Sequence, residues 1–192
     1  FGHDILFTEA NLPFDSNYSI NSTYDFKDTI RLGQDYFRID SLVAYPASLI
    51  LQPLIMKEKI FGFREGDVSK NYEIKSLNNE KTSIKNLLGD KGYILLDFWG
   101  TWCAPCKELT PELVKIHQKH SKKVNFVSLA FQEDPQPVLN YTLKNNMSWF
   151  NGWIEGRPKS GDDSSPIISG LRIECYPTFI VLDKNLKILF RS

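Results

Sequence analysis

The stretch LLDFWGTWCAPCKELTP, Leu95–Pro111, decides the fold of this chain. Its first residues form a nearly continuous apolar run, which is typical of a buried strand, and the residues after Cys103 have the pattern of a helix. Cys103 and Cys106 stand three positions apart where the two patterns meet. If a helix begins at this point, both sulfur atoms lie on one side of it and can reach disulfide geometry.

A helix that begins at the cysteine pair would also activate a thiol. The partial positive charge and free N–H groups of a helix N-terminus stabilise a thiolate at Cys103, and the thiolate is the nucleophile in thiol–disulfide exchange. Pro105 suits the first turn, where a missing N–H costs little. Trp99 and Trp102 are expected to form a flat apolar surface around an exposed sulfur. The stretch therefore predicts a redox-active cysteine pair.

The cysteine pair has two alternative interpretations, a zinc site and a purely structural disulfide. A zinc site needs two pairs, or one pair with two histidines. The further candidates are Cys175 and three histidines, of which His117 and His120 lie well along the same predicted helix. A purely structural disulfide between residues three apart closes a very small loop and gains little stability. We therefore expect no metal at this pair and favour redox chemistry.

The composition excludes several classes of partner. The 192 residues include 23 Lys and Arg and 23 Asp and Glu, so the formal net charge is zero and no basic field points to nucleic acid or to an anionic membrane surface. Three cysteines are too few for a disulfide framework, and no apolar run has the length of a membrane span. The chain begins at Phe1 rather than at a methionine, so we expect a processed or trimmed protein, and any signal peptide or lipid anchor would lie outside this sequence.

From Tyr72 onward strands alternate with helices, which predicts a mixed α/β sheet. On the long helix, the apolar Leu109, Leu113 and Ile116 are expected on one buried face together with His117. The expected elements are a hairpin over 72–84, a central strand over 93–99, a helix over 104–120, a strand over 124–131, a helix over 137–146, a short strand within 147–154, a loop over 155–166 and a final hairpin over 177–192.

The N-terminal third of the chain has a different character. It is rich in Asn, Ser, Asp and aromatic residues, and Thr29–Leu42 has the alternation of a hairpin with a turn at Gly33-Gln34. This portion is predicted to be mainly β. The polar run REGD, Arg64–Asp67, predicts a boundary that divides the chain into residues 1–66 and 67–192.

Residues 97–106, DFWGTWCAPC, resemble the active-site signature of the thioredoxin superfamily. Three flanking features narrow the resemblance to the TlpA/ResA-like thiol–disulfide oxidoreductases of the bacterial cell envelope. These are a hairpin before the central strand, an insertion before YPTFIVLD at 176–183, and the WCxPC form of the cysteine pair. The resemblance covers about Asp67 to Ser192. It implies a thioredoxin-like fold, a central mixed sheet flanked by helices, preceded here by the mainly β N-terminal portion.

The resemblance implies roles for the cysteines and for the loop that faces them. Cys103 would be the attacking nucleophile and Cys106 the buried resolving thiol. Pro177 matches the family's cis-proline, whose loop faces the cysteine pair and presents backbone to a bound substrate strand. Trp102 would pack beside the sulfur and contact partners. Tyr176 is a candidate substrate contact, with a plain loop aromatic as the alternative.

Asp97 matches the family's buried acid, which helps to move the proton to and from Cys106. A lone Asp in an apolar strand is costly unless it is protonated or hydrogen-bonded, which independently favours a functional role. The chain departs from the thioredoxin pattern here, because the next strand, Val124–Phe131, has no Lys or Arg to accompany the acid, and Ser128 is its nearest polar candidate. Pro111 matches the proline that kinks the active-site helix.

Two further features have both a structural and a functional explanation. Cys175 lies two residues before Pro177, and we expect a small buried residue there, with a second reactive thiol as the alternative. Trp149, Phe150 and Trp153 are expected to be core residues, with a substrate groove as the alternative.

These features together predict a thiol–disulfide oxidoreductase that exchanges the Cys103–Cys106 dithiol or disulfide with protein disulfides, preferentially as a reductase. No cofactor is expected beyond that disulfide, and a partner thiol protein would supply electrons. The resemblance implies a periplasmic or membrane-anchored place in the bacterial cell envelope. One alternative is a non-enzymatic binding module on a thioredoxin-like scaffold. The other alternative is a thiol peroxidase. That class typically has a Thr-x-x-Cys motif with an Arg nearby, but here Thr101 lies only two residues before Cys103 and no Arg is near in the sequence.

Overall fold

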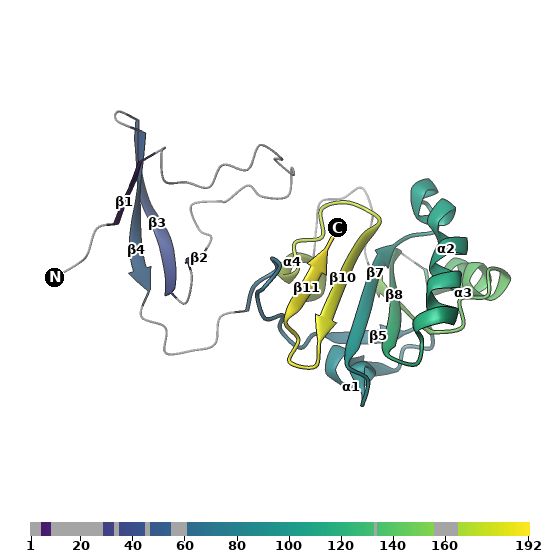
Figure 1. Ribbon diagram of the computed structural model, residues 1–192. Helices are drawn as coiled ribbons and strands as arrows, with labels where there is room; N and C mark the ends of the chain where they lie inside the picture. Colours follow the sequence, from purple (N-terminus) through teal and green to yellow (C-terminus); the bar gives the residue numbers. More distant parts are fainter. Residues whose placement is uncertain are drawn as a thin grey trace. The chain divides into compact units, whose positions relative to one another are not determined.

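The chain consists of two compact units, residues 1–60 and 61–192 (Figure 1). The structure is a computed structural model that describes residues 5–8, 29–32, 35–44, 47–54, 61–132, 134–155 and 165–192.

The N-terminal unit contains a four-stranded antiparallel sheet, which confirms that this portion is mainly β. The strand order is β1-β4-β3-β2, and the buried side chains of Phe37 and Leu51 form a small hydrophobic cluster. The predicted hairpin is present as the β2–β3 pair, whose Gly33-Gln34 turn lies outside the described residues. The strands are β1 (Ile5–Thr8), β2 (Thr29–Leu32), β3 (Asp35–Ala44) and β4 (Ala47–Leu54).

The larger unit is built on a seven-stranded mixed sheet with the order β11-β10-β7-β8-β9-β5-β6. The central strands β7, β8 and β9 are parallel, and the remaining pairs are antiparallel. This topology confirms the predicted mixed α/β sheet. The strands are β5 (Glu73–Ser76), β6 (Lys81–Ser83), β7 (Tyr93–Trp99), β8 (Val124–Gln132), β9 (Phe150–Glu155), β10 (Thr178–Asp183) and β11 (Ile188–Arg191).

Helices cover both faces of this sheet (Figure 1). Because side chains alternate along a strand, Leu96 and Phe98 of β7 face one layer and Asp97 and Trp99 face the other. The first layer packs on α1 and α4, and the second packs on α2 and α3. Asp97 therefore lies on the sheet face that the cysteine-bearing helix covers. The helices are α1 (Ile84–Leu88), α2 (Ala104–His120), α3 (Pro135–Lys144) and α4 (Pro166–Gly170).

One predicted helix boundary differs from the structure, and two short helices were not expected. Helix α3 begins at Pro135 rather than Pro137, because Asp134 caps it by accepting a 2.9 Å hydrogen bond from the Gln136 N–H. The short helices α1 and α4 were not predicted. The predicted loop over 155–166 falls mostly on residues outside the described part of the chain, while Glu155 ends β9 and Pro166 begins α4.

The buried face of α2 is also different from the predicted one. Cys106, Thr110 and Leu113 are buried, whereas Leu109 and Ile116 are 44% and 42% exposed. Cys106 and Thr110, four residues apart, define the buried stripe of the helix. Leu109 and Ile116 lie beside this stripe. The expectation that Leu109 and Ile116 belong to the core was therefore wrong.

The boundary between the units lies six residues earlier than predicted. The segment before Asp67 belongs to the larger unit, because the Gly66 N–H donates to the Ile188 carbonyl at 2.8 Å and the Gly62 N–H donates to the Val68 carbonyl at 3.0 Å. Polar composition marked this segment as a linker, but its backbone completes the β11 edge of the sheet.

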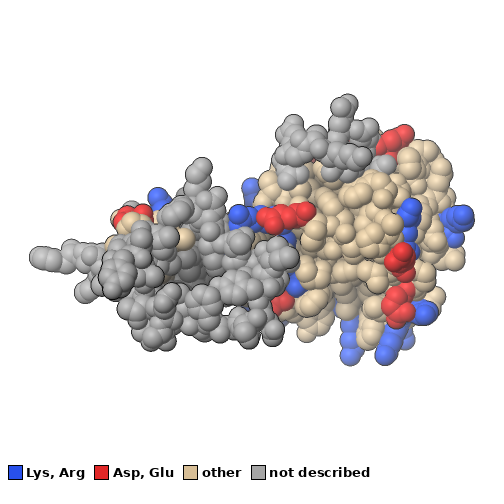
Figure 2. All heavy atoms as spheres, turned by 90° about the horizontal axis from the view of Figure 1, so that it is seen from above, with Lys and Arg blue, Asp and Glu red and all other residues tan. Residues whose placement is uncertain are grey.

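Charged side chains of both signs are interspersed on the larger unit in the view of Figure 2. This distribution agrees with the zero formal net charge of the chain. Within the described residues, no helix combines the length and the apolarity that crossing a bilayer requires.

Candidate redox site

The two cysteines form a disulfide at the start of α2. Their Cα atoms are 5.3 Å apart, and Cys103 is the N-cap residue of the helix. The Cys106 N–H donates to Cys103 Sγ at 3.2 Å, so a sulfur atom occupies the place of the usual capping oxygen. Pro105 lies in the first turn, as predicted, and its side chain is exposed. The helix N-terminus thus points its free N–H groups and its partial positive charge at the disulfide.

The surface around the disulfide is made by Trp102 and not by Trp99. Trp102 is 42% exposed, whereas Trp99 is only 2% exposed and packs beneath the cysteines. Cys103 itself is 4% exposed, so the prediction of an exposed sulfur was wrong for this oxidised form.

The Trp102 indole is fixed by one hydrogen bond and one ring contact. Its Nε1–H donates to the Phe131 carbonyl at 2.9 Å, and its ring meets the Tyr176 ring edge to face at 5.2 Å between centroids. Gly100 makes this position possible, because a side-chain carbon at residue 100 would overlap the indole.

The loop before β10 completes the site. The Tyr176–Pro177 peptide bond is cis, as the family resemblance implied. The Tyr176 ring stacks on the Phe131 ring at 6.0 Å and packs against the cluster that contains both cysteines. The structure therefore brings Trp102, Tyr176 and the cysteine pair together.

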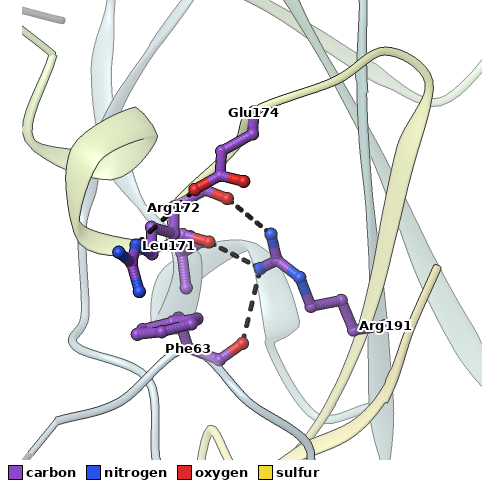
Figure 3. A network of polar contacts seen from close by, with 5 residues as sticks. All are labelled: Phe63, Leu171, Arg172, Glu174 and Arg191. Atoms are coloured by element: carbon purple, nitrogen blue, oxygen red, sulfur yellow. Dashed lines mark hydrogen bonds and ion pairs between the residues drawn. The ribbon is translucent and has the colours of Figure 1, made fainter. Parts of the chain in front are cut away.

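Arg191 anchors the segment that leads into this loop (Figure 3). Its guanidinium donates to the carbonyls of Leu171 and Arg172 at 2.5 Å and 2.6 Å, and to the Phe63 carbonyl at 3.4 Å. The Arg172 side chain lies over the Phe63 ring and pairs with Glu174 at 3.6 Å.

Asp97 is buried beside Ser128, its partner in the β7–β8 register. The Ser128 hydroxyl donates to Asp97 Oδ2 at 2.7 Å. Burial raises the pKa of Asp97 to about 7, and the hydrogen bond from Ser128 opposes that rise. A carboxyl group with such a pKa can both accept and return a proton near neutral pH.

Two polar side chains near this site, Thr110 and Tyr141, were not expected there from the sequence, and Trp149 was expected only as a core or groove residue. The Trp149 Nε1–H donates to Ser128 Oγ at 2.8 Å. The Thr110 hydroxyl donates to the Cys106 carbonyl at 3.1 Å, and the Tyr141 hydroxyl donates to Thr110 Oγ1 at 3.2 Å. The spacing of Thr110, four residues after Cys106 on a helix, is the one signal in the sequence that could have revealed this second contact.

One expectation near the site is corrected, two are confirmed, and one stays a prediction. Cys175 is exposed rather than buried, with its Sγ 3.8 Å from Thr178 Oγ1 on the loop before β10. Trp153 is a core residue as expected. Trp149 also packs against a core cluster, the one that contains both cysteines, and its indole N–H in addition donates to Ser128. Pro111 lies inside α2, and the kink expected there stays a prediction.

The described part of the chain holds no cluster of three or more His, Cys, Asp or Glu side chains arranged for a metal ion. The chemistry available to the site is that of the cysteine pair, with Asp97 as a buried acid on the same face of the sheet.

The fold and the site define a thioredoxin-like domain. A thioredoxin-like family model matches residues 91–188, just over half of the chain, and the chain therefore belongs to that family. It is similar to the thioredoxin-like protein YneN of Bacillus subtilis (strain 168), with 33% identity over 90 residues, or 47% of this chain and 51% of YneN. It is also similar to the thiol-disulfide oxidoreductase ResA of Bacillus anthracis, with 28% identity over 125 residues, or 65% of this chain and 66% of ResA. The chain thus spans between half and two thirds of the length of these relatives.

Solved structures support the fold. A thiol-disulfide oxidoreductase from Bacteroides fragilis NCTC 9343 has a TM-score of 0.56 and 23% identity, covering 65% of this chain and 89% of that one. The thioredoxin domain of a thiol-disulfide oxidoreductase from Bacteroides vulgatus has a TM-score of 0.57 and 20% identity, covering 67% and 88%. At these identities the likeness concerns the fold.

Proposed function

We propose that the chain is a thiol–disulfide oxidoreductase that reduces protein disulfides with its Cys103–Cys106 pair. The observation that carries the proposal is a disulfide capping the N-terminus of α2, on the same sheet face as a buried Asp97 whose pKa is raised to about 7. Trp102 and Tyr176 supply an aromatic surface beside the disulfide, and they are the proposed contacts for substrate protein.

In the first step, the Cys103 thiolate attacks one sulfur of a substrate disulfide. A mixed disulfide forms, and the other substrate sulfur leaves with the electron pair as a thiolate. The Cys106 N–H, which donates to Cys103 Sγ in this structure, stabilises negative charge on that sulfur.

In the second step, the Cys106 thiol gives its proton to the Asp97 carboxylate. The resulting Cys106 thiolate attacks Cys103 Sγ, the intramolecular disulfide forms, and the second substrate thiolate leaves. The substrate gains two electrons and the chain loses two. A partner thiol protein then reduces the chain by the same steps in reverse, so the chain's own disulfide is its redox group.

The bacterial cell envelope is the proposed location. Support comes from the WCxPC form of the motif and from the similarity to ResA. A periplasmic or membrane-anchored chain would meet its substrates in an oxidising compartment, where protein disulfides form and persist.

Equilibration with glutathione or dithiothreitol buffers tests this function. A single dithiol–disulfide transition near −270 mV, at the thioredoxin end of the scale, is the result expected for a reductase, whereas a potential near −120 mV would mean an oxidant. A Cys106→Ser variant should accumulate the mixed disulfide with substrate proteins, and the Cys103→Ser variant should not. If no transition is found, the chain is a binding module, and consumption of hydrogen peroxide would instead make it a peroxidase.

A further inference from the structure

A chain of hydrogen bonds runs from Trp149 through Ser128 to Asp97. The Trp149 Nε1–H donates to Ser128 Oγ at 2.8 Å, and the Ser128 hydroxyl donates to Asp97 Oδ2 at 2.7 Å. Asp97 and Ser128 are directly paired on the parallel strands β7 and β8, and Trp149 immediately precedes β9. Three successive segments of the sheet therefore each contribute one member.

The direction of the first of these hydrogen bonds is fixed by chemistry. An indole N–H can only donate, so Ser128 Oγ must accept from Trp149. The single hydrogen of the Ser128 hydroxyl is then donated to Asp97 Oδ2. Because an ionised carboxylate only accepts hydrogen bonds, this orientation favours the ionised form of Asp97 over the protonated one.

No cation takes part in this arrangement among the described residues of β8, which carries neither Lys nor Arg between Val124 and Phe131. Ser128 is completely buried and Asp97 is 4% exposed, so bulk solvent screens this pair only weakly. In such a site, two aligned polar groups have a larger effect on a carboxylate than they would have at the surface.

We propose that Ser128 and Trp149 are positioning residues for the proton transfer between Cys106 and Asp97. Trp149 orients the Ser128 hydroxyl, and Ser128 holds the Asp97 carboxylate ready to accept the proton. In the reverse reaction, an external thiolate attacks Cys103 Sγ, the Cys106 sulfur leaves with the electron pair, and protonated Asp97 returns the proton to it. This inference rests on the proposed function and adds the residues that tune its acid.

The titration of Asp97 must be distinguished from that of the other titratable groups near this face of the sheet. They are the two thiols and His117 on α2, Tyr141 on α3, and Lys91 before β7. His117 contacts Trp149 directly, at 4.8 Å between ring centroids. These two residues and Lys91 line one pocket of about 260 Å³, together with Asn125 and Ser148 among others. A measurement on the Asp97 carboxyl itself is therefore needed.

The test is a titration of the Asp97 side-chain carboxyl carbon by ¹³C NMR in the full 192-residue chain. Ser128→Ala should move the Asp97 midpoint upward by about one pH unit, since a hydrogen bond to the charged form is lost. Trp149→Phe should move it in the same direction by less. The double variant should match Ser128→Ala alone, because Trp149 acts only through Ser128.

Two matched variants guard against a general structural effect. Trp153→Phe removes a buried indole N–H that has no hydrogen-bond partner among the described residues, and should leave the Asp97 midpoint unchanged. Ser128→Thr keeps the hydroxyl and should restore most of the original Asp97 midpoint. That result would show that the upward shift in Ser128→Ala is not caused by a folding defect.

The rate of reduction by dithiothreitol supplies a second readout. After correction for the thiolate fraction of the reagent, the pH profile should show an inflection that moves with the Asp97 midpoint. At pH 8, Ser128→Ala should react about fivefold faster than the parent chain, because more of its Asp97 is protonated. Absence of any dithiol–disulfide transition in the parent chain would overturn this inference together with the proposed function. A normal transition with an unmoved Asp97 midpoint in both variants would overturn this inference alone.

Discussion

The Arg191 guanidinium donates a 2.5 Å hydrogen bond to the Leu171 carbonyl at the end of α4. The same group also reaches the carbonyls of Arg172 and Phe63, so one side chain from the last strand binds two separate segments of the domain (Figure 3). Both carbonyls at the end of α4 would otherwise lack a helical partner. Arg191 thus anchors the segment that leads into Tyr176–Pro177.

Arg191→Met should destabilise the domain by about 2–4 kcal/mol, because two or three partly buried carbonyls lose a charged donor. Chemical denaturation measures the change. Lys81→Met is the control, since Lys81 forms an exposed pair with Glu73 at 2.9 Å and should change stability by less than about 0.5 kcal/mol. Equal effects of the two variants would contradict the anchoring role.

Asp97→Asn should alter how stability depends on pH. Burial raises the folded pKa of Asp97 to about 7 from its ordinary value of 3.8, so the folded chain binds more protons than the unfolded chain between these values. The contribution of Asp97 to stability is therefore greatest below pH 3.8, falls as the pH rises, and levels off above about 7.

The Asp97→Asn variant should lack this decrease in stability with rising pH. At pH 8 it should be more stable than the parent chain by at most about 4 kcal/mol. Urea denaturation at pH 4, 6 and 8 measures it. Parallel stability curves for the two proteins across this range would show that Asp97 keeps an ordinary pKa.

Lys91→Met should raise the pKa of His117. Burial lowers the pKa of this histidine first, and the positive charge of Lys91 lowers it further. The variant removes the second cause only, so the pKa should rise and stay below 6.5. A proton NMR titration of the imidazole measures it, with Lys115→Met as the control on the same helix, where Lys115 pairs with Glu112. A rise of equal size in both variants would contradict a specific effect of Lys91.

Gly100→Ala should displace the Trp102 indole. A methyl group at residue 100 overlaps this ring and would break its hydrogen bond to the Phe131 carbonyl. Stability should fall by about 1–3 kcal/mol, and the indole N–H resonance of Trp102 should shift. Gly92→Ala is a matched control, because the added carbon there meets nothing within 4 Å. An unshifted Trp102 resonance in the alanine variant at residue 100 would contradict this account.

The sequence was most informative where one local pattern determines the structure. The apolar run before Trp99 predicted β7, and the helical pattern after Cys103 predicted α2 with the observed bounds. The cis-proline at residue 177 followed from the family resemblance, since no local pattern specifies it.

Ser128 was the nearest polar candidate for Asp97 and does donate to it, whereas the hydrogen bond from Trp149 to Ser128 could not be predicted in the same way. Trp149 and Ser128 are 21 residues apart, and only the order of strands in the sheet brings the indole N–H to the hydroxyl. On α2, apolar character pointed to Leu109 and Ile116, but the buried stripe is set by Cys106 and Thr110. Periodicity shows that a helix has a buried face, and tertiary packing decides which of two neighbouring stripes it is.

The capping of α2 by Cys103 has a consequence for how the reaction can be followed. The atom that accepts the Cys106 N–H is the same sulfur that exchanges bond partners in the proposed reaction. A neutral disulfide sulfur is a weak hydrogen-bond acceptor, whereas a thiolate is a strong one. The N-terminus of α2 is therefore held more tightly when the disulfide is reduced. The exchange rate of the Cys106 backbone amide is therefore expected to report the oxidation state of the cysteine pair, with no added dye.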